Sequence, residues 1–457
     1  MTHAGKYTLG FLFVTFAFFP GTETSYAQEK RESSYSPVIE ESFDKVVAQD
    51  KSRKASVMKR HMDLLHERYN LSRNVTTEVT MSGGKALPVG PTARMKGGMT
   101  WEKLARMTPE EIKQEGVFPY LPLPHPNHAS GGMLFPQNQI QQFPRLERFD
   151  LDFDLPEHFL PESPPPIFLT THKDMGDVSQ GQVISLDNYY EIFNGILNPK
   201  QLEGLRLLVT QFPQQQFNAT ADRKSEKPSQ GVTCFDCHVN GHTSGATHLV
   251  GDIRPQSHRN RIETPSLRGV NIQRLFGSQR ALKTVEDFTE FEQRAAYFDG
   301  DHLTAAKKGV NILERGSQVH FMAEFQALLD FPPAPKLELY GRLDQAKATD
   351  SEKRGEKIFF GKGKCASCHG APYYTDNQMH DLQLERFFKA RTINDQYIRA
   401  SGPIKTFPLR GIKDSPPYLH DGRLLTLEDA VEFFNLVQQL NLNSQEKKDL
   451  TAFLRQL

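Results

Sequence analysis

The sequence predicts a mainly α-helical protein, in which two helical units of the same plan follow a loop-rich, proline-rich N-terminal extension. First, the pattern C-x-x-C-H occurs twice, at residues 234–238 and 365–369. Second, an amphipathic helical segment precedes each copy and another follows it, as expected for a diverged internal duplication. Third, residues 116–170 are dense in proline and are typical of loop or extended structure.

The length and charge of the chain exclude some classes of protein. The chain has 457 residues, which is enough for several domains. Its 55 Lys and Arg residues are balanced by 55 Asp and Glu residues, so the net charge is zero. No basic surplus favours a nucleic-acid partner, and no acidic surplus indicates a disordered tail.

Residues 1–27 have the pattern of a secretory signal peptide. Lys6 is followed by an apolar run of 11 residues, Leu9 to Phe19, which is too short to span a bilayer. Pro20 breaks the run, and "SYA" before Gln28 fits a cleavage site. A buried hydrophobic helix is the alternative interpretation. We therefore expect a periplasmic protein with no membrane span.

Residues 28–184 are expected to form an irregular extension with short helices. A mixed-charge helical piece is predicted near 40–69, a flexible linker at 81–99 and a short helix at 100–115. The proline-rich stretch after it favours a wrapping segment over an independent core.

Residues 185–335 form the first predicted helical unit. Asn198 is expected to be the N-cap of a helix with Pro199 at its first position. The first C-x-x-C-H motif follows about 25 residues after this helix. A long helix near 317–331 ends at the proline-broken boundary 331–341.

Residues 336–457 repeat this plan. A capped amphipathic helix runs into a glycine turn and the second motif. Thr426 is expected to cap a later helix, with Asp429 at the capping-box position, and a helix over 444–457 ends the chain.

Each C-x-x-C-H motif is predicted to attach a haem c covalently. The two thiols add to the vinyl groups of one haem, and the adjacent histidine becomes a ligand of its iron. A four-thiolate zinc site and a redox dithiol are the competing interpretations. The zinc site leaves the histidine after both motifs unexplained, and the dithiol would need a βαβ context that neither motif has. The predicted attachment residues and iron ligands are Cys234, Cys237 and His238 in the first unit, and Cys365, Cys368 and His369 in the second.

Several stretches resemble the bacterial di-haem cytochrome c peroxidases and their MauG-type relatives. The most specific is "FPLRGIKDSPPYLHDGRLLTLEDAVEFFN" at 407–435; "EKRGEKIFFGKGKCASCHGAPYYTDNQMHDL" and "IETPSLRGV" match as well. The resemblance covers roughly 185–457 and implies two tandem cytochrome c-like haem domains, 185–335 and 336–457. It also implies that the first haem reacts with peroxide or oxidises a substrate, while the second relays electrons to it.

Three positions depart from the family pattern. Phe434 occupies the place of a Met or Tyr that ligates the second iron, and phenylalanine cannot be a ligand. Phe276 lies in the segment where the family has a tryptophan between the haems. The acid that cleaves the O–O bond has no clear counterpart; the candidates are Glu290, Glu292, Asp299 and Asp301.

The remaining site residues are expected from the same resemblance. Candidates for the distal ligand of the first iron are His248, His258 and, less favoured, His242, and for the second iron Met379, His380 and His420. A calcium ion between the domains would be held by Glu263, with Asn260 as a substitute, and by the carbonyls of Ser415 and Pro417. A solvated Glu263 is the alternative.

We therefore expect an exported di-haem oxidoreductase. Its expected partners are a small periplasmic electron donor, such as a cytochrome c or a cupredoxin, and peroxide or another small substrate, with a homodimer as a further expected assembly. The main alternative is a periplasmic electron-transfer cytochrome without catalysis, and a scaffold with structural haems is a third hypothesis.

Overall fold

The computed structural model describes residues 39–41, 43–124, 133–147, 151–152, 155–214, 223–225, 229–249, 261–277, 280–295, 312–389, 391–393, 396–398 and 402–457. All of them belong to one unit of the chain, Ser33–Leu457. None of the helices in this described part combines the length and the hydropathy that crossing a bilayer requires.

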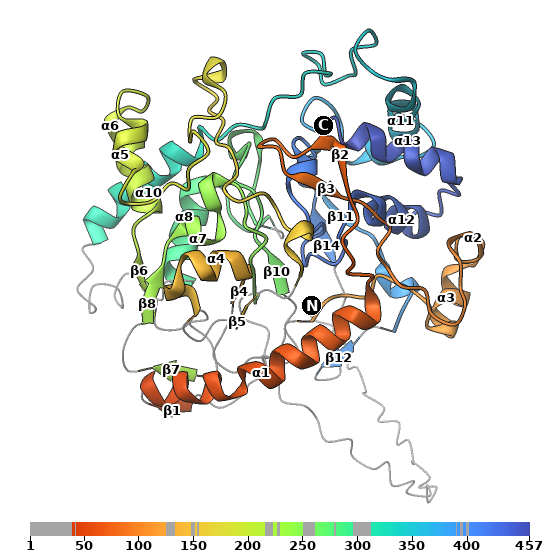
Figure 1. The fold of residues 1–457 in the computed structure, drawn as a ribbon, viewed down its shortest axis with the longest axis horizontal. Coiled ribbons are helices and arrows are strands. Elements are labelled where there is room, and N and C mark those ends of the chain that lie inside the picture. Colours follow the sequence, from red (N-terminus) through yellow and green to blue (C-terminus); the bar gives the residue numbers. More distant parts are fainter. Residues whose placement is uncertain are drawn as a thin grey trace, which may run out of the picture. The chain divides into compact units, whose positions relative to one another are not determined.

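Regular structure in the described residues is mainly helical (Figure 1). Helix lengths reach 26 residues in α1, whereas the longest strand, β2, has six. The α-helices are α1 (Phe43–Arg68), α2 (Trp101–Leu104), α3 (Pro109–Glu115), α4 (Gln137–Gln142), α5 (Tyr189–Phe193), α6 (Pro199–Leu208), α7 (Cys234–Cys237), α8 (Val285–Ala295), α10 (Ile312–Gln326), α11 (Asp350–Phe360), α12 (Leu427–Val437) and α13 (Ser444–Leu454).

The strands are short and form one four-stranded sheet, in the order β10-β9-β4-β5, and several two-stranded ones. In the larger sheet, β4 of the extension pairs antiparallel with β9, with Leu134 opposite Thr247. The strands are β1 (Ile39–Glu41), β2 (Val75–Thr80), β3 (Ala86–Pro88), β4 (Met133–Phe135), β5 (Leu151–Asp152), β6 (Phe212–Gln214), β7 (Arg223–Ser225), β8 (Ser229–Val232), β9 (Thr247–Leu249), β10 (Arg261–Glu263), β11 (Met379–Asp381), β12 (Arg391–Ile393), β13 (Gln396–Ile398) and β14 (Pro403–Lys405).

The helix starts follow the local sequence. Asn198 accepts a hydrogen bond from the Gln201 amide at 3.0 Å, and Pro199 occupies the first turn of α6, as the sequence predicted. Thr349 caps α11 in the same way, and the Thr426 side chain accepts from the Asp429 amide at the start of α12. These polar caps satisfy amides that the helix itself leaves unpaired.

The same helix pair occurs once in each half of the chain. Helix α6 packs against α10, and α11 packs against α13 (Figure 1). Each pair meets at a glycine six residues after an N-cap: a Cβ atom at Gly204 would overlap the carbonyl of Phe321, and one at Gly355 would overlap that of Asp449. Both pairs therefore depend on a backbone approach that only glycine allows.

A second repeated feature is the Leu-Arg-Gly turn. Gly269 and Gly411 both adopt left-handed backbone conformations, with φ of 73° and 70°. The Gly269 amide donates to the Leu329 carbonyl at 2.8 Å, and the Gly411 amide donates to the Leu457 carbonyl at 2.9 Å. Each turn thus ties its half to the residues just after that half's last helix. The pattern was present in the sequence, as "SLRG" and "PLRG", but was not recognised as a repeat.

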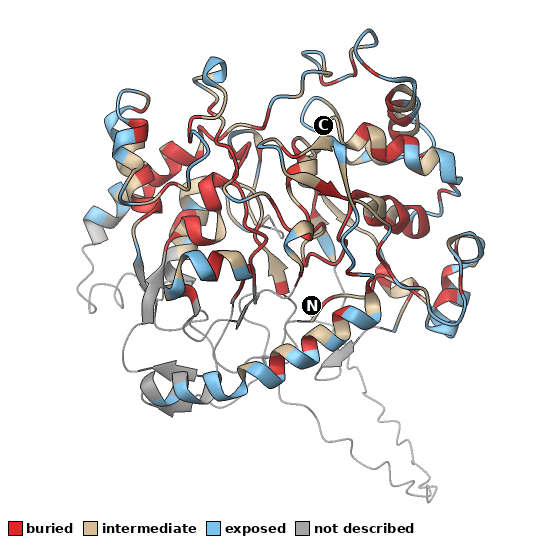
Figure 2. Cartoon of the chain, viewed as in Figure 1, coloured by how far each residue is buried: buried red, intermediate tan, exposed pale blue. Residues whose placement is uncertain are grey.

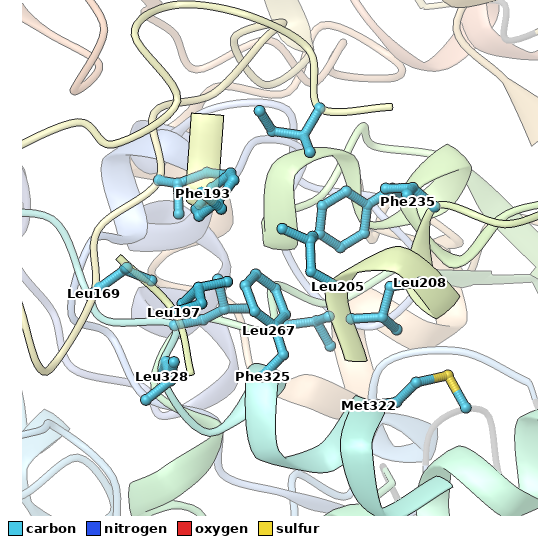
Figure 3. Packing of buried hydrophobic residues seen from close by; sticks show 14 of the residues in the cluster. Leu169, Phe193, Leu197, Leu205, Leu208, Phe235, Leu267, Met322, Phe325 and Leu328 are labelled. Carbon is cyan, nitrogen blue, oxygen red and sulfur yellow. The ribbon is translucent and has the colours of Figure 1, made fainter. Parts of the chain in front are cut away.

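The hydrophobic cores follow the two halves. One core, formed by residues between Ile167 and Leu329, includes Phe235 of the first motif, which lies near Leu205 and Phe325 (Figure 3). Another core unites α11, α12 and α13 with residues that flank Cys365. Figure 2 shows that α12 is buried along most of its length, whereas α1 is mostly exposed.

The extension shares the cores of both halves. Leu104, Phe118 and Tyr120 pack with residues of α12, and Ile167 lies in the core of the first half. The helix predicted near 40–69 is α1, and the helix predicted at 100–115 is divided into α2 and α3.

Residues 81–99 are not the predicted flexible linker. Leu87 in β3 is buried, and the Thr92 amide and hydroxyl donate to the Asp429 carboxylate at 2.8 and 2.7 Å. A buried carboxylate that accepts several hydrogen bonds fixes the backbone that donates them.

Candidate functional site

The second C-x-x-C-H motif holds its histidine in one orientation. His369 follows the short helix Cys365–Ser367, and its Nδ1 lies 2.8 Å from the Tyr374 carbonyl oxygen. A carbonyl can only accept, so Nδ1 carries the proton and Nε2 keeps its lone pair. Burial lowers the pKa of His369, which favours the neutral ring. This arrangement is the one that a metal-ligating histidine requires.

The thiols of this motif are not those of a reactive dithiol. Burial raises the pKa of Cys365 to about 12 and also raises the pKa of Cys368. Redox-active cysteines need a lowered pKa. The four cysteines, Cys234, Cys237, Cys365 and Cys368, form no disulfide. The motif therefore fits covalent haem attachment better than redox-dithiol chemistry.

An ion pair with the extension holds the first motif in place. Cys234–Cys237 form α7, and the Asp236 carboxylate accepts from the Thr233 amide at 2.6 Å. Arg145 donates to both oxygens of the same carboxylate, at 2.7 and 2.6 Å. A bidentate guanidinium–carboxylate pair fixes orientation as well as distance. Asp236, one of the two residues between the cysteines, thus anchors the motif to a segment almost a hundred residues earlier.

His238 is suited to bind a metal. Burial lowers its pKa to about 4, which keeps the ring in the neutral form that metals bind. Its Nδ1 is buried and has no hydrogen-bond partner within the described structure. Unlike His369, His238 has no hydrogen bond that fixes its ring in the described structure, although the backbones of Pro265 and His242 lie close to it.

His242 is a structural residue in this fold. Its Nε2 lies 3.0 Å from the Asp414 carbonyl, and its Nδ1 lies 2.7 Å from the Ser266 hydroxyl. Nε2 must donate to the carbonyl, so Nδ1 accepts from the hydroxyl. Both ring nitrogens are engaged, which removes His242 from the candidate iron ligands.

A buried ion pair joins the regions around the two motifs. Arg268 donates to the Asp414 carboxylate at 2.8 Å, with side-chain exposures of 5% and 2%. The Ser82 amide and hydroxyl donate to the same carboxylate at 3.0 and 2.6 Å. Sequence reasoning missed this group, because its members lie far apart in the chain.

Two residues of the predicted calcium set contact neighbouring residues of the loop after the first motif, His242 and Thr243. Glu263 accepts from the Thr243 hydroxyl at 3.0 Å, and the Ser415 hydroxyl lies 3.5 Å from Nε2 of the adjacent His242. Burial raises the pKa of Glu263 well above its usual range. Pro417 forms a cis peptide bond with Pro416, and Asn260 lies outside the described residues.

Of the two favoured candidates for the distal ligand of the first iron, one lies within the described residues and one does not. His248 lies in β9, with its backbone opposite Ile262 of β10. His258, like the acid candidates Asp299 and Asp301, lies outside the described residues.

The two remaining acid candidates lie on α8. The Gln326 amide donates to Thr289 at 3.0 Å and joins α8 to α10. Val285, at the start of α8, packs against the same core as Cys234. Burial raises the pKa of Glu292 to about 7, and Glu290 lies two residues earlier on the same helix.

Of the candidates near the second motif, His380 lies beside it: a His380 ring nitrogen, the Cys368 sulfur and an Asp376 carboxylate oxygen are all within 4.8 Å of one another. Met379 starts β11, and Nε2 of His380 lies 2.7 Å from the Asp376 carboxylate. Burial lowers the pKa of His420 to about 4, and its carbonyl accepts from the Glu263 amide at 2.7 Å. Phe434 packs with the extension in the core around Phe433.

Part of the chain is similar in sequence to cytochrome c peroxidases and to MauG proteins. No family model matches the chain. The chain is 30% identical to cytochrome-c peroxidase IdrP2 of Denitromonas iodatirespirans over 151 residues, 25% of this chain and 41% of that protein. It is 27% identical to the methylamine utilization protein MauG of Methylorubrum extorquens over 150 residues, 30% of this chain and 42% of that protein. The curated relatives are thus di-haem cytochrome c peroxidases and MauG proteins.

The matches span less than half the length of these relatives. Among solved structures, a MauG-like protein associated with microbial copper homeostasis is 19% identical, with a TM-score of 0.41 over 67% of this chain and 94% of that one. A TM-score of this size supports no conclusion about the site.

Proposed function

We propose that this homologue of di-haem cytochrome c peroxidases and MauG proteins is an exported oxidoreductase that carries two haem c groups. The first haem would be attached to Cys234 and Cys237 with His238 as iron ligand, and would take peroxide or another oxidant. The second, attached beside His369, would relay electrons to it from a donor protein.

One observation carries this proposal: each C-x-x-C-H motif lies in a half that has the same glycine-centred helix pair and the same Leu-Arg-Gly turn. Both histidines are also kept neutral by burial. When bound, haem c supplies an iron that changes oxidation state, so that electrons can pass from a donor to a peroxide. The protein's part is to hold the ligands, exclude water and deliver protons.

We assign proton delivery to Glu292. Reduction of hydrogen peroxide to water consumes protons as well as electrons, so a group that exchanges protons near neutral pH is required. The pKa of Glu292 is raised to about 7, which populates both of its forms at neutral pH. Its helix begins at the core that also contacts Cys234. Glu290 is the alternative on the same helix.

We place the electron donor on an exposed apolar patch beside the second motif. Leu339, Tyr340 and Tyr373 are 86%, 76% and 43% exposed. Exposed apolar side chains that gather at one place mark interaction surfaces. The occupant we propose is a small electron-transfer protein such as a cytochrome c or a cupredoxin.

The patch is tied to His369 through the backbone. Gly341 lies against Pro372, where a Cβ atom would come within 2.7 Å of the Pro372 Cα. The Tyr374 hydroxyl donates to the Gly341 carbonyl, and the Tyr374 carbonyl accepts from His369. A donor on this patch would therefore contact the chain close to the second haem.

We also propose calcium at Glu263 and Ser415. A buried carboxyl with a strongly raised pKa is neutral at pH 7 unless a cation balances its charge. Oxygen donors are the ligands that calcium prefers. The expected result is that the purified chain contains calcium and that Glu263→Gln loses it, measured by elemental analysis.

A steady-state assay with peroxide and a reduced small cytochrome c tests the proposed function. The haem-loaded wild-type chain should oxidise the cytochrome, and Glu292→Gln should slow the reaction by about 10²–10⁴-fold. Electron paramagnetic resonance should find one high-spin iron that reacts with peroxide. Two low-spin irons that stay inert to peroxide after half-reduction would contradict the proposal and favour an electron-transfer cytochrome.

A further inference from the structure

Lys405 is a buried cation at the junction of the two halves. It ends β14, where its backbone lies opposite Met379 of β11, and only 3% of its surface is exposed. Its Nζ donates to the Gln273 side-chain oxygen at 2.9 Å. The rings of Phe276 and Phe407 lie on it, with centroids 5.5 and 5.2 Å from Nζ.

The described surroundings of Lys405 lack a negative charge. Its contacts are one amide and two aromatic rings, and no carboxylate of the described residues pairs with it. A buried lysine is rare without an acidic partner, because the desolvation of an ammonium costs several kcal/mol per ion. Contacts with ring faces offset only part of such a cost.

Arg280 adds a second positive charge to the same place. Its guanidinium is close enough to contribute, together with burial, to lowering the pKa of Lys405 to about 8. The Arg280 Nε is buried and has no hydrogen-bond partner in the described structure. Arg280 Nη1 donates to the Gln378 side-chain oxygen at 3.3 Å, so Nε is the donor of this guanidinium that an added anion could use.

The position of this pair suggests the source of that anion. Phe276 packs against the core that contacts Cys234, and the backbone of Phe407 lies beside His369. Lys405 is thus bordered by a residue from the surroundings of each motif. Each haem carries propionate carboxylates, which are the nearest negative charges that the proposed function would bring to this junction.

We propose that Lys405 and Arg280 bind a haem propionate at the junction of the two halves. The inference rests on the proposed function, because it requires haem in at least one motif. The chemistry is the same for a propionate of either haem. The Lys405 ammonium donates to the carboxylate, and the unused Nε–H of Arg280 donates beside it.

A redox titration of the haem-loaded chain, followed by its visible spectrum, tests this proposal without turnover. A positive charge beside the cofactor stabilises its reduced form, so Lys405→Met should lower the reduction potential of the haem whose propionate it binds. Lys405→Arg should keep that potential near the wild-type value. Lys362→Met is the matched control, because Lys362 lies three residues before Cys365 but is 45% exposed and pairs with Glu446.

The titration distinguishes a propionate of the first haem from one of the second. If the propionate belongs to the first haem, only the potential of the iron bound by His238 falls; if it belongs to the second, only that of the His369 iron falls. If neither iron changes its reduction potential between the wild type and Lys405→Met, the proposal is overturned. Because no substrate is turned over, a chain inactive with peroxide still gives a clear result.

A crystal structure of the haem-loaded wild-type chain is the second test, and it covers the case in which Lys405→Met fails to fold. A propionate oxygen within hydrogen-bond distance of Lys405 Nζ is expected. Propionates that all lie elsewhere, with an acidic side chain opposite Lys405 instead, would refute the proposal.

Discussion

The substitution Asp414→Asn tests the buried ion pair that joins the regions around the two motifs. The Asp414 carboxylate, only 2% exposed, accepts from Arg268 and from two donors of Ser82 at 2.6–3.0 Å. An asparagine keeps the shape but leaves the Arg268 guanidinium buried without its counter-charge. Breaking a buried pair in this way costs about 3–5 kcal/mol.

Denaturant unfolding of the haem-loaded chain measures this cost as a shift of the midpoint at unchanged slope. Asp63→Asn is the matched control. Asp63 also forms an ion pair, 2.7 Å from Lys59, but the side chains are 65% and 76% exposed. Its loss should cost less than about 1 kcal/mol. An Asp414→Asn variant no less stable than Asp63→Asn would refute the assignment of Asp414 as a buried connection.

Further substitutions follow from the structure. Gly204→Ala and Gly355→Ala should each lower the free energy of unfolding by about 1–3 kcal/mol, because the added methyl group overlaps the backbone of the opposite helix. Gly316→Ala on α10 is the control: no described atom lies within 4 Å of its Cβ position, so this variant should not be destabilised. The folded chain holds the Glu292 proton up to a pKa of about 7, whereas the ordinary pKa of a glutamate is 4.5, so the protein loses stability as the pH rises between these two values. Glu292→Gln should abolish this loss, measured as the change of Tm from pH 5 to 8. Tyr340→Ser should raise KM for the donor protein while leaving the reaction of the enzyme with peroxide unchanged; an unaltered KM would remove the proposed patch from the donor site.

The features that the sequence predicted best are local. Asn198 and Thr426 cap their helices as expected, because a cap depends on residues within one turn of it. The two C-x-x-C-H motifs were likewise recognised from five consecutive residues each. The glycine contacts of α6 and α11 were not predicted, because they depend on which helix packs opposite.

The extension shows the opposite case. Its glycine and proline content made residues 81–99 resemble a linker, yet Ser82 and Thr92 donate to carboxylates more than three hundred residues away. Composition reports local backbone freedom and contains no information about a distant acceptor. Asp414 and Asp429 could only be identified as those acceptors once the fold had brought them together.

In the candidate site, too, the local motif could be predicted from the sequence, whereas the contacts made by distant residues could not. His369 could be predicted with its motif, but the carbonyl of Tyr374 that orients its ring could not. His242 lay close to the first motif in sequence, yet its ring is used by Ser266 and Asp414. The candidate distal ligands His248 and Met379 lie in short strands, β9 and β11, whose pairing with β10 and β14 depends on long-range packing.

The central claim is that each half of the chain carries one covalently attached haem c. The most direct measurement is the intact mass and the pyridine haemochrome spectrum of the chain after export with the cell's haem-attachment machinery. The expected result is two haems per chain, falling to one in either Cys234→Ala/Cys237→Ala or Cys365→Ala/Cys368→Ala. A wild-type chain without covalent haem, or with zinc bound by the four thiolates instead, would contradict it.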